Sequence, residues 1–516
     1  MENWTVEEVC SYLRQQGLEQ WVENFQAAQI TGKRLQNIVT TALEEKDPLK
    51  QCLKILHHLK MPWKSPFKEM KVFNDPVHGH IELHPLLVCI IDTPQFQRLR
   101  HIKQMGAGYF VYPGAAHNRF EHSIGVAYLA GELLKTLRER QPELDISNRD
   151  ILCVQIDMVH SHTFDGMFMP KAQPTLECKH ETLSIKMFNH MVKENKLESE
   201  MEKYDLITKE DLPFIKALIY RKNTQVSSYG RTAAKSFLFD IVSNKRNGID
   251  VDKWDYLARD CYHLGIRNNF DHWRFLKFAR VCQRDGRKLI CTRDKEAWNL
   301  YDMFYTRYFI HRRACHHRVK DIIENMITDA FLKADAHLNI SQAVEDMDTY
   351  TKLTDHIFEE ILNSKKNELK ESRSILQKIL CRKIYKCVGE TPPLKTEEDT
   401  EVRLSVISLD YGKKEENPMK DMYFYRKQNP NEAISIEQHE VSHLLPEKFF
   451  EQIVRVYCRK ADNKKVQEAK MKFENSFKEF ERNTTITALH LGPLLPSDAT
   501  MIVLLFLATH ITTSSI

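Results

Sequence analysis

Three helical segments of the sequence carry side chains whose types and spacing suit metal or phosphate chemistry. In the first, Arg119 and His122 are three residues apart, so a helix places them on one face. Imidazole is a ligand of transition metals, and the planar guanidinium group of arginine holds phosphate through parallel hydrogen bonds. A single histidine on a helix is nonetheless more often structural, so both interpretations stay open for this pair.

The second segment is a predicted helix with Asp250 as its N-cap. Asp252, Tyr256 and Asp260 follow one another at intervals of four residues and form one polar stripe, and Lys253 lies beside it. Two carboxylates, a phenol and an amine on neighbouring faces suit a metal ion and a phosphorylated substrate. The alternative is a solvated helix face with ordinary ion pairs, and the spacing alone does not separate the two.

The third segment places Arg307, His311 and Cys315 at intervals of four residues on a predicted helix. Basic residues fill much of the stretch 312–318, and aromatic side chains recur between 301 and 308. Such a helix suits a phosphate or nucleotide site. A basic surface helix that packs through its aromatic stripe explains the pattern equally well.

The elements that must position these side chains are mainly helical. Residues 1–60 have apolar spacings typical of a small helical module, and residues 116–390 are helical for most of their length. The helix that begins at Asp250 is expected to end near Gly265. Two hairpins are predicted, one over residues 71–83 and one over residues 280–291, where Asp285-Gly286 is a strong turn signal.

The part of the chain after residue 389 mixes strands and helices. A polar, proline-containing loop is expected over Gly389–Glu401. Strands are predicted over Val402–Leu409 and Met422–Tyr425. Helices are predicted near residues 446–460 and 463–481.

Composition excludes several classes of protein. At ~150 residues per domain, 516 residues suggest about three domains. The 75 basic and 71 acidic residues nearly balance, which excludes nucleic-acid binding by bulk charge alone. The 12 cysteines form no CxxC pair, which argues against a zinc ribbon and fits a reducing compartment. The apolar run Met501–Ala508 is too short to span a bilayer well, so a membrane partner is not expected.

Longer stretches of the chain resemble a known family, the sterile-alpha-motif and HD-domain deoxynucleoside triphosphate triphosphohydrolases of animals. The matching stretches are Lys71–Pro85, Ile91–Arg100, His117–Ser123, Ile241–Tyr256, Asn299–Phe304, Tyr350–Asp355 and Leu444–Phe449. The resemblance implies a mainly α fold, with an α-helical HD-type core that includes small β hairpins. It assigns residues 1–60 to a shortened sterile-alpha-motif domain, 61–70 to a linker, 71–390 to the core, 391–482 to an α+β C-terminal lobe and 483–516 to a divergent tail.

The resemblance also implies an activity, the hydrolysis of a deoxynucleoside triphosphate to deoxynucleoside and triphosphate. Of the family's metal ligands, a histidine matches His122 and a distant aspartate matches Asp252. The His-Asp doublet between them is missing, because a short segment is absent within residues 157–166. The resemblance implies a divalent metal (Mg, Mn, Fe or Zn) and assigns acid-base and water-positioning roles to three residues, which are His162, Asp165 and His180.

The substrate pocket keeps more of the family's residues. By resemblance, Arg119, Lys253 and Arg307 contact the triphosphate. Tyr256 stacks against the sugar, where a ribose hydroxyl would clash, and Gln104 and Asp260 orient the deoxyribose. The remaining pocket positions are Met105, His311 and Cys315, and Cys315 replaces a tyrosine that packs on the base, which implies looser packing there.

Members of this family are activated by guanine nucleotides, GTP or dGTP, that join dimers into tetramers. The guanine-reading site is matched by Lys71, Val72, Asp92, Gln97 and Arg100, and the contacts to a second nucleotide by Asn74, Arg274, Arg293, Lys295, Arg382 and Lys386. The resemblance further implies a nuclear location, with the cytoplasm as the alternative, and roles in dNTP pool control and antiviral defence. Two alternatives remain, a catalytically impaired, guanine-nucleotide-binding oligomeric regulator and a protein that binds single-stranded RNA or DNA.

Overall fold

The computed structural model describes residues 4–15, 22–27, 31, 70–158, 167–174, 180–221, 229–392, 402–443, 445–459 and 462–475. The chain divides into two compact units, residues 1–70 and 71–516. Predicted features that lie outside the described residues are His162, Asp165 and the apolar run Met501–Ala508. Within the described ranges, no helix is both long and apolar enough to cross a membrane.

The first unit contains two described helices, α1 (Val6–Gln15) and α2 (Val22–Ala27). Val9, Leu13 and Phe25 are buried between them, as the helical spacing predicts. The N-terminus of α1 is capped from Thr5, whose hydroxyl accepts from the backbone N–H of Glu8 at 3.3 Å. The rest of the predicted helical module lies outside the described residues.

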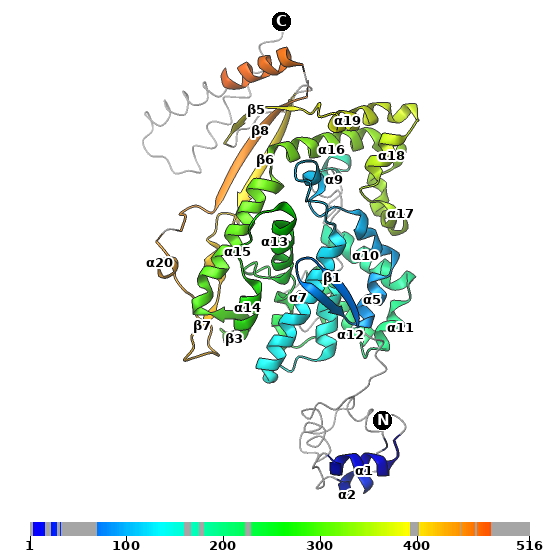
Figure 1. The fold of residues 1–516 in the computed structure, drawn as a ribbon, viewed down its shortest axis with the longest axis vertical. Helices are drawn as coiled ribbons and strands as arrows, with labels where there is room; N and C mark the ends of the chain where they lie inside the picture. The colour runs from blue at the N-terminus through cyan, green and yellow to red at the C-terminus, as the bar shows by residue number, and fades with distance from the viewer. Residues whose placement is uncertain are drawn as a thin grey trace. The chain divides into compact units, whose positions relative to one another are not determined.

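The second unit is mainly α-helical, as predicted (Figure 1). Its helices are α5 (Pro85–Ile91), α6 (Pro94–Gln97), α7 (Arg119–Arg140), α8 (Asn148–Ile156), α9 (Met169–Ala172), α10 (His180–Glu194), α11 (Leu197–Glu202), α12 (Thr208–Ile219), α13 (Val251–Leu264), α14 (His272–Phe278), α15 (Ala297–Ile310), α16 (Arg318–Leu338), α17 (Met347–Lys352), α18 (Ile357–Asn363), α19 (Lys370–Leu380) and α20 (Gln438–Val441). The largest apolar core lies around α7, α8 and α13, where Leu133, Ile156 and Trp254 are buried.

Both predicted hairpins form. Strands β1 (Lys71–Asp75) and β2 (Gly79–Leu83) pair antiparallel, and so do β3 (Arg280–Arg284) and β4 (Arg287–Arg293). Asp285 and Gly286 at the second turn have φ angles of 50° and 73°, the left-handed pair that a two-residue hairpin turn requires. The short strand β7 (Phe424–Tyr425) extends this sheet by pairing parallel to β4.

The predicted helix at residues 446–460 is wrong. This stretch forms strand β8 (Phe450–Cys458), which lies between β5 (Lys386–Thr391) and β6 (Val402–Asp410) in an antiparallel sheet. Pairing on both edges outweighs the helical spacing, and β-branched and aromatic side chains such as Ile453 favour a strand. The strand prediction for the segment that forms β6 is confirmed, and residues 463–475 are helical as expected.

Local capping fixes the two helices that carry the predicted chemistry. The side chain of Asp250 accepts from the backbone N–H of Lys253, and Gly265 ends α13 with a φ of 67°. Asn118 and Glu121 form a capping box at the start of α7. The two ends of α13 agree with the sequence predictions.

Helix α15 departs from the predicted spacing at its C-terminus. It continues as one turn of π-helix, His311–Cys315, in which the N–H of His316 donates to the carbonyl of His311 at 2.8 Å. The wider turn adds about one residue to the repeat. Because of this wider turn, Cys315 does not lie directly above His311, although it follows four residues later. The single stripe of Arg307, His311 and Cys315 that the sequence predicts is therefore interrupted.

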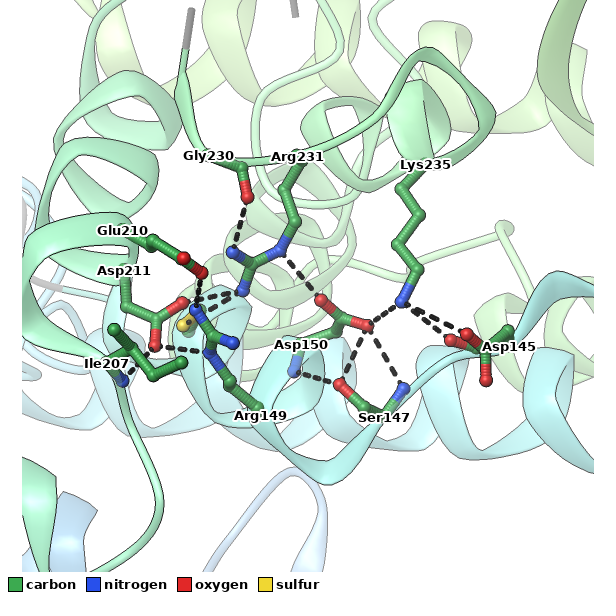
Figure 2. A network of polar contacts seen from close by, with 11 residues as sticks. Asp145, Ser147, Arg149, Asp150, Ile207, Glu210, Asp211, Gly230, Arg231 and Lys235 are labelled. Carbon is green, nitrogen blue, oxygen red and sulfur yellow. Dashed lines mark hydrogen bonds and ion pairs between the residues drawn. The ribbon is translucent and has the colours of Figure 1, made fainter. Parts of the chain in front are cut away.

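A buried network of charges joins α8, α12 and the 3₁₀ helix Ala233–Asp240. Arg231 lies between two carboxylates, and its Nε and Nη2 donate to Asp150 and Asp211 at 2.8 Å each (Figure 2). Arg149 donates to Asp211 at 2.6 Å, and Lys235 donates to Asp150 at 2.7 Å. Both carboxylates are almost fully buried, so their cations must stay with them.

We expect Arg231→Met to lower the free energy of unfolding by about 3–5 kcal/mol, because it leaves two buried carboxylates with one cation fewer. Urea unfolding followed by circular dichroism measures the change. Lys135→Met is the matched control, since Lys135 pairs with Glu132 on the surface of α7 and such pairs contribute at most about 1 kcal/mol. Equal losses in the two variants would contradict a structural role for this network.

Candidate active site

The centre of the site is the crossing of α7 and α13. His122 of α7 lies between two carboxylates of α13, with Nε2 3.1 Å from Asp252 Oδ1 and Nδ1 2.7 Å from Asp255 Oδ2. The two aspartates are three residues apart and so face the same way. Burial alone would lower the pKa of His122, but the hydrogen bonds and charges of the two carboxylates raise it to about 9.

Asp255 also anchors the β1–β2 hairpin to α13. Its carboxylate accepts from Arg259 at 2.8 and 2.9 Å and contacts His78 Nε2 at 2.7 Å. Arg259 donates in turn to Asp75, at the end of β1, at 2.8 Å. Because Asp255 engages Nδ1 of His122, the other ring nitrogen, Nε2, is the one that faces Asp252.

The close approach of α7 to α13 requires a glycine. A Cβ atom on Gly125 would lie 1.8 Å from Asp255 Oδ1, far inside any allowed contact. The site therefore depends on a small residue one turn after His122 as well as on the charged groups.

The donor set at this crossing suits a divalent cation only in part. His122 and Asp252 face each other, and Asp157, at the end of α8, is fully buried near the charge of Asp252. Burial and that neighbouring charge raise the pKa of Asp157 well above its usual range. No group of three or more metal-ligating side chains occurs within the described residues. Two donors fit a hard cation that takes its other ligands from water and substrate phosphates.

A cavity of about 1380 Å³ opens beside this crossing. Five of the nine predicted substrate residues line it, and they are Gln104, Met105, Arg119, Asp260 and Cys315. In its wall, Asp260 contacts Nε2 of His117 at 2.6 Å, which fixes the carboxylate. Burial raises the pKa of the Cys315 thiol to about 12, so this side chain is a neutral thiol at pH 7.

The other four predicted substrate residues do not line this cavity, and they lie near one another. The Nη1 group of Arg307 donates to the backbone carbonyl and to Oδ1 of Asp410, both at 2.7 Å. Burial raises the pKa of Tyr256 to about 12, against the nearby positive charges of Arg307 and Lys253. Burial and the charge of Arg307 lower the pKa of His311 to about 3.

Of the three predicted catalytic residues, one is placed by the described part of the chain. His162 and Asp165 lie outside it, and His180 is the first residue of α10. Their assignment stays a prediction.

The predicted guanine-reading residues form a chain of contacts. Lys71 Nζ lies 3.9 Å from Asp92, Gln97 donates to the carbonyl of Ile91 at 2.7 Å, and Arg100 donates to Gln97 at 2.8 Å. Val72 is exposed beside Lys71 on β1. Four of the five residues are thus linked through contacts around Asp92.

The residues predicted for the second nucleotide are more dispersed. Asn74 contacts His80 across the first hairpin at 2.7 Å. Arg274 and Lys295 lie over the ring of Phe278, and Arg293 pairs with Asp294 at 3.2 Å. Arg382 donates to the carbonyl of Phe110 at 2.7 Å, and Lys386 begins β5.

Sequence reasoning missed several residues of this site. Asp255 lies three residues after Asp252 on the same helix, and Lys320 and Glu324 have the four-residue spacing of a helical ion pair, so a local signal existed for both. Asp410 meets Arg307 from 103 residues away, and no local pattern indicates that contact.

The amino-acid sequence is similar to a known domain family and to several known proteins. Residues 1–60 match the model of the SAM domain (sterile alpha motif) family. The chain is 52% identical over 525 residues to the deoxynucleoside triphosphate triphosphohydrolase SAMHD1 of Danio rerio, covering 92% of this chain and 84% of that protein. It is 49% identical over 533 residues to SAMHD1 of Homo sapiens, with the same coverage. A SAMHD1 homologue of Dictyostelium discoideum is 36% identical over 419 residues, 76% of this chain and 78% of that protein.

We expect Asp255→Asn to lower the free energy of unfolding by about 3–5 kcal/mol, because the fully buried Arg259 loses half of its carboxylate partners. Asp252→Asn is the matched control on the same helix, since Asp252 is 37% exposed and a change below about 1 kcal/mol is expected. Chemical denaturation measures both. A loss in Asp252→Asn as large as that in Asp255→Asn would refute the ranking.

His272 gives this region a pH-dependent stability. Burial, with His78 adding to it, lowers the pKa of His272 from 6.5 to about 4, against the charges of Asp255 and Asp271. The unfolded chain therefore takes up this proton first, and stability is lost as the pH falls from 6.5 towards 4. At pH 5 the loss is about 2 kcal/mol. In urea titrations, the free energy of unfolding of His272→Gln relative to that of the native protein should therefore rise by this amount between pH 7.5 and pH 5. An unchanged difference would contradict the buried neutral state.

Proposed function

Because this chain belongs to the SAMHD1 family of deoxynucleoside triphosphate triphosphohydrolases, we propose that it binds a dNTP beside the α7–α13 crossing and hydrolyses it to deoxynucleoside and triphosphate. The observation that carries the proposal is a cavity lined by five predicted substrate residues, one of which, Arg119, lies one turn before the His122 that pairs with Asp252. When a divalent cation displaces the proton of His122, the pair offers it one imidazole nitrogen and one carboxylate oxygen. When bound, such a cation supplies positive charge against the phosphate oxygens.

The triphosphate is held by Arg119, Lys253 and Arg307. Arg307 is prepared for this role, because Asp410 engages only its Nη1 group. A guanidinium group has five N–H donors, so the edge formed by Nε and Nη2 still has three donors for phosphate. Lys253 is held by Asp250 at 3.1 Å until a phosphate competes for it.

The sugar lies between Tyr256, Gln104 and Asp260. The ring of Tyr256 stacks on the deoxyribose and excludes a 2′-hydroxyl, which selects deoxynucleotides over ribonucleotides. Contact with His117 keeps the carboxylate of Asp260 in place to accept from a sugar hydroxyl. His162, Asp165 and His180 supply the acid-base and water-positioning groups.

Guanine nucleotides regulate the enzyme by binding at the chain of contacts around Asp92. The carboxylate of Asp92 accepts from the amino edge of guanine, and Arg100 donates to its carbonyl. GTP or dGTP bound there joins dimers into tetramers, with Asn74, Arg274, Arg293, Lys295, Arg382 and Lys386 holding a second nucleotide. The proposed location is the nucleus, where the protein controls dNTP pools.

A second function is favoured by one observation, the absence of the His-Asp doublet from the sequence. Two remaining ligands bind a transition metal far more weakly than four, because even outer partners of a metal site change affinity by about 10–100-fold. As such a regulator, the chain binds guanine nucleotides and assembles with other copies but does not hydrolyse dNTP. No contact within the described residues favours binding of single-stranded RNA or DNA.

Purified full-length protein with dGTP or dATP, GTP and Mg²⁺ or Mn²⁺ tests the two functions. An active enzyme releases triphosphate and deoxynucleoside in a molar ratio of one, and Asp252→Ala abolishes both. Asp348→Ala, an exposed aspartate that pairs with His190, is the matched control and should leave the rate unchanged. GTP-dependent tetramers without triphosphate release would instead establish the regulator.

A further inference from the structure

An ion pair lines the cavity on the side formed by α16. Lys320 and Glu324 are four residues apart, and Lys320 Nζ lies 2.5 Å from Glu324 Oε1. Their side chains are 10% and 27% exposed, and both belong to the cavity wall together with Cys315 and Met105. Most pairs of this spacing lie in solvent, so this one is unusual in facing a cavity.

The 3₁₀ turn Gly106–Phe110 packs against α16 beside this pair. A Cβ atom on Gly106 would lie 3.1 Å from Glu324 Oε1, and its φ of 52° also requires glycine. A Cβ atom on Gly108 would lie 3.8 Å from the side chain of Lys320. The backbone of this turn therefore approaches Glu324 closely and is in ordinary contact with Lys320.

The position of the pair relative to a nucleotide rests on the proposed function. Arg119, with His122 one turn further along α7, takes the triphosphate, and Cys315 lies where the base ends. Cys315 is small, and the charges of Lys320 and Glu324 act on its thiol, so the pair is close to it. The edge of a bound base therefore reaches Lys320 and Glu324, because position 315 carries a small thiol in place of the tyrosine ring.

We propose that Lys320 and Glu324 recognise the base by hydrogen bonds and make dGTP the preferred substrate. Lys320 has three N–H donors, and Glu324 has two oxygens that accept. Guanine offers N1–H and the N2 amino group side by side, which match the two oxygens of a carboxylate, and its O6 accepts from an ammonium group. Adenine, cytosine and thymine lack this pair of adjacent donors. A bidentate contact of this kind gives discrimination of about 10- to 100-fold.

The test measures binding of dNTP analogues in which a methylene group replaces the 5′ ester oxygen, so that hydrolysis is blocked. Full-length protein is used at saturating GTP, which fills the activator site equally in every sample. Binding that Arg119→Ala abolishes belongs to the cavity. We expect the dGTP analogue to bind about 10-fold tighter than the dITP analogue, which lacks only the N2 amino group.

Two variants separate the two contacts. In Glu324→Gln the preference for dGTP over dITP should fall to about one, because the amide loses one acceptor oxygen. In Lys320→Met the preference for dGTP over dATP should fall, while the preference for dGTP over dITP stays, because both of the latter keep O6. Lys333→Met and Glu371→Gln are the matched controls, since these residues form an exposed pair outside the cavity.

The outcomes distinguish recognition of the base by Lys320 and Glu324 from the proposed function itself. Equal cavity binding of all analogues by the native protein, or preferences that survive both variants, would overturn recognition of the base and leave the proposed function standing. Absence of any binding sensitive to Arg119→Ala would overturn the proposed function and, with it, this inference. The comparison of dGTP with dITP needs no variant, so a variant that fails to fold does not prevent the test.

Discussion

The carboxylate of Asp255 is the group on which the rest of the site depends. It is fully buried and meets His122, His78 and Arg259 at once, so a single aspartate joins α7, α13 and the β1–β2 hairpin. A buried carboxylate is tolerable only with such partners, and the positive charge of Arg259 holds its pKa well below the usual range. The constraint acts in both directions, because the same contacts that stabilise Asp255 also orient the imidazole that faces Asp252.

Two other sets of ion pairs join elements away from the crossing of α7 and α13. The network around Arg231 (Figure 2) fixes α8, and Asp157 caps the C-terminal end of that helix. Asp410, at the end of β6, fixes Arg307 from the C-terminal lobe. These ion pairs thus hold together elements that are distant in sequence, and the apolar core alone would not specify such contacts.

The cavity differs in character along its length. Its cationic end, with Arg119, suits a triphosphate, whereas its α16 side presents Cys315 and the pair Lys320–Glu324. A neutral thiol gives little contact area to a base, so the proposed selectivity comes from hydrogen bonds instead of packing. In this proposal, binding of the phosphates, which every dNTP shares, is separate from recognition of the base.

The sequence by itself determined the features that rest on neighbouring residues. Asp250 and Gly265 bound α13, Asp285-Gly286 turns the second hairpin, and the long family matches indicate the activity, because caps, turns and motifs are local. Tertiary structure decided what depends on distant segments. The 446–460 stretch became a strand because β5 and β6 pair with it, and Asp255 and Asp410 found their partners only through packing. Such pairings carry no periodic signal, since their energy comes from burial that exists only in the folded chain.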